Sequence, residues 1–213
     1  ADDFGYSPGV NKGIIEAFKR GIVTSSSVMM NSPFLPKVLK FHSKHPQFDL
    51  GLHLVPDFGK RNSNINHLEN QVRKFVNIFR RKPSSLSFHC SRNSLALLSP
   101  NNAKILFFWS KVIGKKYKIP LRGEQAQKSF SFLASKNFEQ TKKSLKSIFT
   151  QLKTGVNELI VHPGYRKDPR LDSSYSPLLR EMERRVLTSK EIVVILKRRG
   201  IELCDYSIFK ARR

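Results

Sequence analysis

The sequence of 213 residues contains little cysteine, few acidic residues and no long apolar run. Its 2 cysteines, Cys90 and Cys204, are too few for a disulfide framework, and they do not form a Cys-x-x-Cys pair. The longest apolar runs, such as residues 192–196, are far shorter than a membrane span, and no basic-then-apolar leader is visible. We therefore expect a cytoplasmic globular protein with no membrane partner.

Acidic residues are outnumbered by basic residues, 16 against 39, which gives a formal net charge of +23. A charge of this size is typical of proteins that bind nucleic acid or another polyanion. The basic residues are nevertheless spread along the chain, in short groups such as residues 80–82 and 197–199, without an RNA-binding signature or zinc-finger spacing. We interpret most of them as solvated helix faces and expect no specific nucleic-acid partner, with polyanion binding kept as an alternative.

Helix-like and strand-like patterns alternate along nearly the whole chain. With residues 1–3 counted as the end of a strand, the other predicted strands are residues 26–30, 48–54, 86–89, 119–122, 157–162 and 201–206. The predicted helices are residues 7–20, 35–45, 65–79, 103–116, 138–153 and 188–199, and the predicted loops are residues 59–64, 125–137 and 167–176.

Regular alternation of strands and helices predicts a parallel sheet. We therefore predict one α/β domain over residues 1–213, with an irregular (β/α) TIM-barrel-like fold of about seven strands. No glycine-rich phosphate-binding motif follows the early strands, so a nucleotide-binding fold has no support.

Residues with acid–base or metal-binding chemistry lie where the predicted strands end. They are Asp2, Asp3, His53, His89, Arg122 and His162. The active site of an α/β barrel is built at the C-terminal ends of its strands, so we expect these side chains to converge. Taken singly, each has a structural interpretation, as a turn cap, a hydrogen-bonded core histidine or an ion-pair partner. Taken together, the set favours an active site.

The same residues have complementary chemistry. One carboxylate and two imidazoles from separate strands can bind a divalent metal and leave positions open for water and substrate. A second carboxylate beside the metal can take a proton from the attacking water, and the Asp2-Asp3 pair supplies one carboxylate for each task, since neighbouring strand residues point in different directions. His162 is the candidate general acid, and Arg122 is the candidate partner that keeps the base ionised. These roles predict a metal-dependent hydrolase.

Several short motifs occur along the chain in a fixed order. They are Ala-Asp-Asp-Phe-Gly at residues 1–5, Gly-Ile-Ile-Glu-Ala at 13–17, Gly-Ile-Val-Thr-Ser at 21–25, Gly-Leu-His-Leu at 51–54, Val-His-Pro-Gly-Tyr at 161–165, and Arg-Glu at 180–181. In this order they resemble the YdjC-like carbohydrate deacetylases, the chito-oligosaccharide deacetylase type. The resemblance implies a (β/α) barrel-like fold of the glycoside hydrolase and deacetylase type.

The resemblance also implies an activity and a cofactor. The implied enzyme removes N-acetyl groups from small amino-sugar oligosaccharides of the chitobiose type, so its partner is an N-acetylated sugar. Its divalent metal is usually assigned as Mg²⁺, with Zn²⁺ as the alternative. By position, the family's base matches Asp2, and its metal ligands match Asp3, His53 and His89. A homodimer is implied as well, although no interface is visible in the sequence.

The sequence departs from the family pattern in two places. Where the family has Asp-Ser-His-x-His, this chain has Ser87 in place of the aspartate and Ser91 in place of the second histidine, while His89 is kept. Loss of the carboxylate predicts a poorly oriented His89 and about 10–100-fold weaker metal affinity or activity. The usual apolar residues before Ala1 are missing, so we expect a domain truncated at this end. A degenerate family member that binds sugar without turnover is therefore the second hypothesis, beside the polyanion-binding protein.

Overall fold

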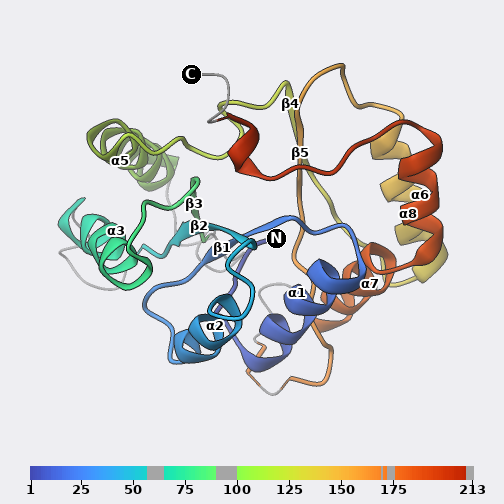
Figure 1. The fold of residues 1–213 in the computed structure, drawn as a ribbon, viewed down its shortest axis with the longest axis horizontal. Coiled ribbons are helices and arrows are strands. Elements are labelled where there is room, and N and C mark those ends of the chain that lie inside the picture. The colour runs from blue at the N-terminus through green and yellow to red at the C-terminus, as the bar shows by residue number, and fades with distance from the viewer. Residues whose placement is uncertain (57–64, 90–99, 169, 172–175, 210–213) are drawn as a thin grey trace.

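The computed structural model describes residues 1–56, 65–89, 100–168, 170–171 and 176–209 (Figure 1). The helices are α1 (Pro8–Arg20), α2 (Leu35–His42), α3 (Ile65–Phe79), α5 (Pro100–Tyr117), α6 (Phe138–Phe149), α7 (Pro177–Leu187), α8 (Lys190–Arg198) and the 3-10 helix η1 (Tyr206–Phe209). The strands are β1 (Ser25–Val28), β2 (Asp49–Leu54), β3 (Leu86–Phe88), β4 (Lys128–Ser131) and β5 (Asn157–Ile160). None of the helices within these ranges is both long and apolar enough to span a bilayer.

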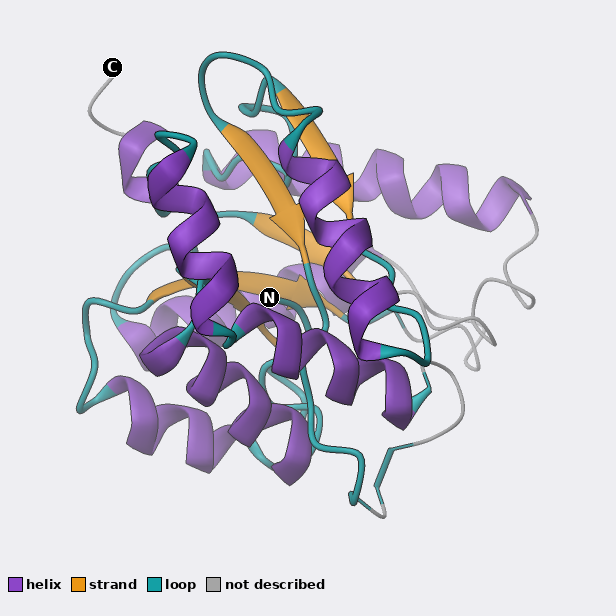
Figure 2. Cartoon of the chain, turned by 90° about the vertical axis from the view of Figure 1, so that its right-hand side faces the viewer, coloured by secondary structure: helices purple, strands orange, loops and turns teal. Residues whose placement is uncertain are grey.

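The strands form two parallel sheets that are joined by the N-terminal segment. One sheet has the order β1-β2-β3 and the other pairs β4 with β5. Residues 1–4 lie between the sheets, because the Asp2 N–H donates to the Val161 carbonyl and the Phe4 N–H donates to the Ser27 carbonyl. Figures 1 and 2 show the helices on the outside of these strands. The segment that carries the aspartate pair is therefore held from both sheets.

The predicted α/β class with parallel strands is confirmed, but the strand count is corrected. Within the described ranges there are five regular strands, while Phe4 and Leu121 each contribute a single bridge at the edges of the first sheet. These two segments are extended but too short to form ladders. Closure into a barrel between residues 119–122 and β4 is not confirmed.

Four other elements differ from the prediction. The predicted strand at residues 201–206 is wrong, because residues 201–205 are irregular and Leu203 is 50% exposed. Strand β4 lies within residues 125–137, which the sequence predicts to be a loop. Only Phe130 of this strand is buried, so the strand shows little hydrophobic alternation. Helix α7 falls just beyond a predicted loop, and its buried face includes charged residues that hide its hydrophobic pattern. Helix α8 is capped by Ser189 rather than beginning at the predicted residue 188.

A cluster of phenylalanine side chains fixes the segment that carries the aspartate pair. Phe4 is fully buried, and its ring lies edge-to-face against Phe41 of α2 at 5.8 Å and against Phe48 at 6.0 Å. Phe18 of α1 contacts the same two rings. Burial of a phenylalanine side chain stabilises a fold by about 1.5–3 kcal/mol, so this anchor holds the neighbouring Asp3 in place.

Helix α1 begins at a tightly bound N-terminus that also holds the loop after β5. The Ser7 hydroxyl accepts a hydrogen bond from the Val10 N–H at 3.2 Å, and the Asp168 carboxylate accepts one from the Gly9 N–H. Burial raises the pKa of Asp168, but its hydrogen bonds with Ser7, Arg170 and Gly9 outweigh burial and hold that pKa below its usual value. The carboxylate therefore contributes to stability in its charged form.

We expect Asp168→Asn to destabilise the protein by about 1–2 kcal/mol at neutral pH, because a helix N-terminus stabilises the carboxylate charge. The folded-state pKa is depressed, so this contribution is present above the unfolded pKa of about 3.9 and is lost as the pH falls through the folded value. Urea unfolding of both proteins from neutral to acidic pH measures the difference, which should shrink toward acid. A difference that stays constant would contradict the prediction.

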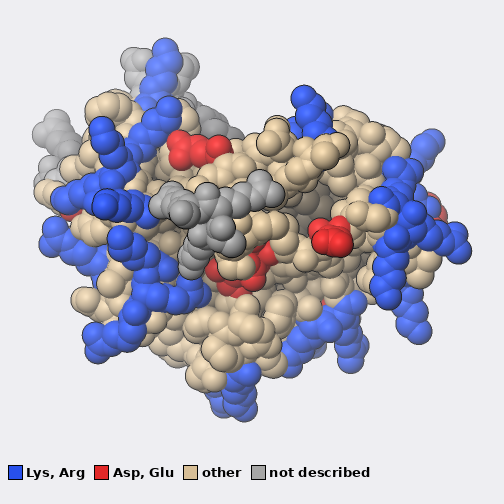
Figure 3. Space-filling view, turned by 45° about the horizontal axis from the view of Figure 1, so that its top comes forward, with Lys and Arg blue, Asp and Glu red and all other residues tan. Residues whose placement is uncertain are grey.

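Lysine and arginine side chains cover both flanks of the face drawn in Figure 3, over α3 and α5 on one side and over α6 and α8 on the other. Some of them pair locally: Lys142 and Lys146 of α6 both contact Glu191 of α8, at 2.8 Å and 2.5 Å. On this face the basic residues gather on two separate flanks rather than in one patch.

Candidate metal and catalytic site

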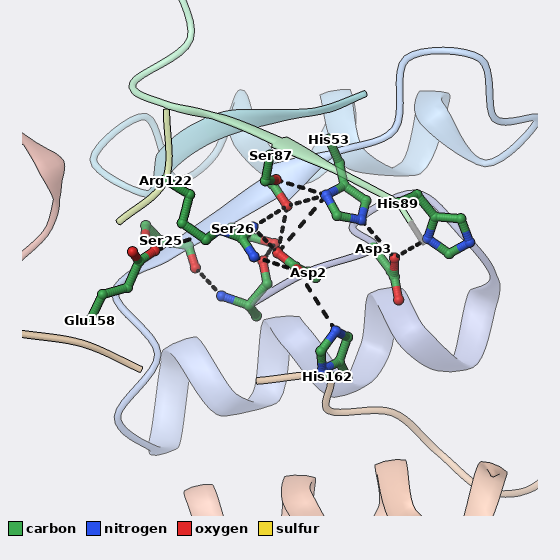
Figure 4. A network of polar contacts seen from close by, with 12 residues as sticks. Asp2, Asp3, Ser25, Ser26, His53, Ser87, His89, Arg122, Glu158 and His162 are labelled. Carbon is green, nitrogen blue, oxygen red and sulfur yellow. Dashed lines mark hydrogen bonds and ion pairs between the residues drawn. The ribbon is translucent and has the colours of Figure 1, made fainter. Parts of the chain in front are cut away.

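The structure brings the six predicted site residues together (Figure 4). Asp2 and Asp3 precede α1, and the other four come from or directly follow extended segments. These are His53 in β2, His89 after β3, Arg122 beyond the bridge at Leu121, and His162 after β5. The side chains meet at one end of the parallel strands, as expected for the C-terminal ends. Their individual roles stay predictions.

The two aspartates point in different directions because of a turn, and not because of the strand alternation that we expected. Asp3 has a φ of 69°, in the left-handed region, and its carbonyl accepts from the Tyr6 N–H at 2.9 Å. Aspartate tolerates this region better than most residues, although holding it there costs about 1–3 kcal/mol. The Gly5 N–H donates to Asn11 Oδ1 at 2.6 Å, which ties the turn to α1. Both carboxylates are buried, with Asp2 4% and Asp3 2% exposed.

Asp2 lies in a cage of hydrogen-bond donors. Both terminal nitrogens of Arg122 donate to its two oxygens, and the Ser27 hydroxyl donates to Oδ1 at 2.8 Å. Burial raises the pKa of Asp2, but the charge of Arg122 outweighs burial and holds that pKa well below its usual range. His162 Nε2 lies 3.6 Å from Asp2 Oδ2. A carboxylate that favours its ionised form and an imidazole therefore face each other across the site.

Asp3 turns one oxygen toward two histidines and the other toward an arginine. Its Oδ1 lies 3.1 Å from His53 Nε2 and 2.9 Å from His89 Nδ1, while Oδ2 accepts from Arg180 at 2.6 Å. Burial raises the pKa of Asp3, and Arg180 and the two histidines outweigh burial and lower it. Burial lowers the pKa of His89, but the hydrogen bond with Asp3 outweighs burial and raises it.

The three side chains Asp3, His53 and His89 fit a divalent metal. One ligand atom from each lies within 4.8 Å of the others. Asp3 Oδ1 lies 3.1 Å from His53 Nε2 and 2.9 Å from His89 Nδ1, so these three ligand atoms converge where an ion would be held. One carboxylate and two imidazoles leave coordination positions for water and substrate.

Ser87 lies against His53 rather than against His89, which corrects the expected consequence of losing the family's aspartate. Ser87 Oγ is 2.8 Å from His53 Nδ1, and Ser27 Oγ is 3.1 Å from the same nitrogen. His89 is instead held by Asp3 and by the Tyr6 ring, 5.8 Å away between centroids. Ser91 lies outside the described residues. The hydroxyl of Ser87 therefore orients His53, one of the candidate metal ligands.

We expect Ser87→Ala to weaken metal binding about 10-fold, since partners of a histidine ligand typically contribute 10–100-fold to affinity. Isothermal titration with Mg²⁺ and Zn²⁺ measures this affinity. Ser84→Ala is the matched control, because Ser84 donates to Asp49 at 2.7 Å, at the other end of β2. Equal affinities for wild type and Ser87→Ala would show that Ser27 alone orients His53.

Two buried charged residues of α7 belong to the site and were assigned no role from the sequence. Arg180 is 3% exposed and binds Asp3, and one of its terminal nitrogens lies 3.5 Å from the His162 carbonyl. Glu183 is fully buried and accepts from the His162 N–H. The spacing of Arg180, Glu183 and Leu187, three and four positions apart, places them on one helix face. This spacing is the feature of the sequence that indicates two charged residues on the buried side of the helix.

The chain is similar to one protein family in its N-terminal part and to curated enzymes over nearly its whole length. Residues 1–86 match the family model described as YdjC-like protein. A carbohydrate deacetylase of Thermoanaerobacter pseudethanolicus is 28% identical over 243 aligned residues, which cover 99% of this chain and 97% of that protein. A carbohydrate deacetylase of Geobacillus stearothermophilus is 27% identical, with 98% and 96% covered.

A solved structure shares the fold. The crystal structure of a candidate cellobiose-phosphate cleavage protein from Enterococcus faecalis matches with a TM-score of 0.75 at 23% identity, covering 98% of this chain and 96% of that chain. The similarity to YdjC-like proteins that the sequence motifs indicated is confirmed by the family match.

Proposed function

Because the first 86 residues carry the YdjC-like pattern, we propose that this chain is a metal-dependent carbohydrate deacetylase. The predicted enzyme class agrees with the curated relatives, which are carbohydrate deacetylases aligned over nearly the whole chain. The observation that carries the proposal is that two adjacent buried aspartates have different partners, which suit them to different tasks. Arg122 holds Asp2 beside His162, and Arg180 holds Asp3 beside two histidines.

Asp3, His53 and His89 are the proposed metal ligands. A divalent ion held by these three side chains would supply Lewis-acid chemistry toward the amide carbonyl and the attacking water. Magnesium is the metal that the family resemblance implies, whereas a set with two imidazoles also suits zinc. Both ions belong in the first experiment.

Asp2 and His162 are the proposed proton-transfer pair. Asp2 accepts the proton of the attacking water, and Arg122 keeps the carboxylate ionised and oriented for that task. His162, whose Nε2 lies 3.6 Å from Asp2 Oδ2, donates a proton to the leaving amine nitrogen. The water oxygen forms a bond to the carbonyl carbon, the C–N bond of the amide breaks, and acetate and a free amino sugar are released.

The proposed substrates are small N-acetylated amino-sugar oligosaccharides of the chitobiose type. The test is acetate release from diacetylchitobiose and triacetylchitotriose by the purified chain loaded with Mg²⁺ or Zn²⁺. Each acetate should appear together with one free amine. Metal and sugar binding without acetate release would contradict the proposal and identify the chain as a sugar-binding protein without turnover.

A further inference from the structure

We propose that Glu158 and Tyr206 are positioning residues that act on the base Asp2 through Arg122. The proposal rests on the proposed function, in which Asp2 takes the proton of water. Neither residue touches Asp2 in the contacts described above. Both lie on the far side of Arg122, in β5 and in the 3-10 helix η1, and Figure 4 shows Glu158 and Asp2 on opposite sides of Arg122.

Arg122 is held between two carboxylates. Its terminal nitrogens donate to Asp2, while its Nε lies 3.5 Å from Glu158 Oε1. The side chains of Arg122 and Glu158 are 16% and 17% exposed, so this pair is shielded from most of the solvent. A guanidinium fixed at both ends presents its two donors in one orientation, and the fork of Arg122 then dictates where the Asp2 oxygens lie.

Tyr206 fixes the glutamate in turn. Its hydroxyl donates to Glu158 Oε1, the oxygen that faces Arg122. Burial raises the pKa of Tyr206, and the charge of Glu158 raises it further, so the phenol remains a hydrogen-bond donor. The contacts therefore run in sequence from Tyr206 to Glu158, Arg122 and Asp2.

A hydrogen bond to the segment before η1 anchors Tyr206 near the site. The Thr24 hydroxyl, just before β1, donates to the Cys204 carbonyl at 2.7 Å. Asp2, Arg122, Glu158 and Tyr206 all line one small cavity of about 100 Å³. If the phenol hydroxyl is removed, water in this cavity replaces it as the hydrogen-bond donor to Glu158. Glu158 and Arg122 are then held less rigidly.

Misplacing a catalytic group by about 1 Å costs up to about 100-fold in rate, so loosening Arg122 should reduce turnover rather than substrate binding. We expect Glu158→Gln to lower kcat for acetate release about 10-fold and Tyr206→Phe to lower it several-fold, with KM changed less than about 2-fold. The double variant should be no slower than Glu158→Gln alone, because both substitutions interrupt the same contacts.

The experiment uses the full chain loaded with metal and measures kcat and KM for the wild type, both single variants and the double variant. The same substitutions are repeated in an Arg122→Ala background, where they should have no further effect. Glu69→Gln is the matched control, since Glu69 is also a shielded glutamate and pairs with Lys116 at 2.7 Å, between α3 and α5. Its kcat should equal that of the wild type, and thermal unfolding reports any general loss of stability.

An unchanged kcat in Glu158→Gln, or an equal loss in the wild-type and Arg122→Ala backgrounds, would overturn the proposal while leaving the deacetylase activity standing. A wild-type chain that releases no acetate refutes the proposed function instead. In that case, urea unfolding of the Glu158 and Arg122 single and double variants tests whether the two residues are coupled. Additive changes in the urea midpoint would show no coupling and would overturn the proposed series of contacts.

Discussion

Asp2→Asn should lower kcat for acetate release by about 1,000-fold, since general-base catalysis typically contributes 100- to 10,000-fold. The amide keeps the size of the carboxylate and one oxygen for Arg122, but it cannot accept a proton. Metal binding should persist, because the proposed ligands Asp3, His53 and His89 are separate side chains. The measurement is kcat and KM on diacetylchitobiose, together with a metal titration of the same variant.

Asp49→Asn is the control for this substitution. Asp49 lies at the start of β2 and accepts a hydrogen bond from Ser84, at the opposite end of the strand from the site. Its kcat should match that of the wild type. Asp2→Asn at wild-type kcat would remove Asp2 as the base, and loss of metal binding in the same variant would assign Asp2 to the metal instead.

Arg180→Met should destabilise the metal-free protein by about 3–5 kcal/mol, because removing one partner of a buried ion pair leaves the other charge uncompensated. Asp3 is 2% exposed, and Arg180 at 2.6 Å is the largest influence that counters its burial. Urea unfolding at neutral pH measures the loss. Saturating metal should recover part of it, because a divalent ion bound to the folded state supplies positive charge beside Asp3.

Arg184→Met is the matched control on the same helix. Arg184 pairs with Glu16 at 3.0 Å and with Glu181 at 2.6 Å, and its side chain is 12% exposed. Because these partners are less deeply buried than Asp3, we expect a smaller loss, about 1 kcal/mol, with no recovery on metal addition. Equal losses for the two variants, both insensitive to metal, would show that Arg180 serves α7 and not the site.

The sequence predicts that the candidate site residues come together, because they lie at the C-terminal ends of predicted parallel strands. Residues such as His53 and His162 end apolar segments, and parallel strands bring such ends to one edge. The pairing of each aspartate with its own arginine could not be anticipated. Asp3 is placed by a left-handed turn, and its partner Arg180 lies 177 positions away along the chain.

The parts of the fold that escaped prediction are those in which polar residues point inward. Arg180 and Glu183 are buried on α7, so charged residues interrupt the hydrophobic pattern on the buried face of that helix. Ile201 and Leu203 alternate with polar residues as in a strand, but Leu203 is exposed and the chain turns into η1 instead. Hydrophobic periodicity identifies packing faces, and it does not identify buried ion pairs.

The joining of the two sheets by residues 1–4 has a consequence for evolution of the site. His53 and His89 belong to the first sheet, and Asp3 adjoins it, whereas His162 follows the second. In the proposed roles, the metal ligands gather at the first sheet, with Asp3 held by Arg180 of α7, whereas the proton-transfer pair Asp2 and His162 spans both sheets. We therefore expect substitutions that loosen the second sheet to impair the proposed hydrolysis more than the proposed ion binding.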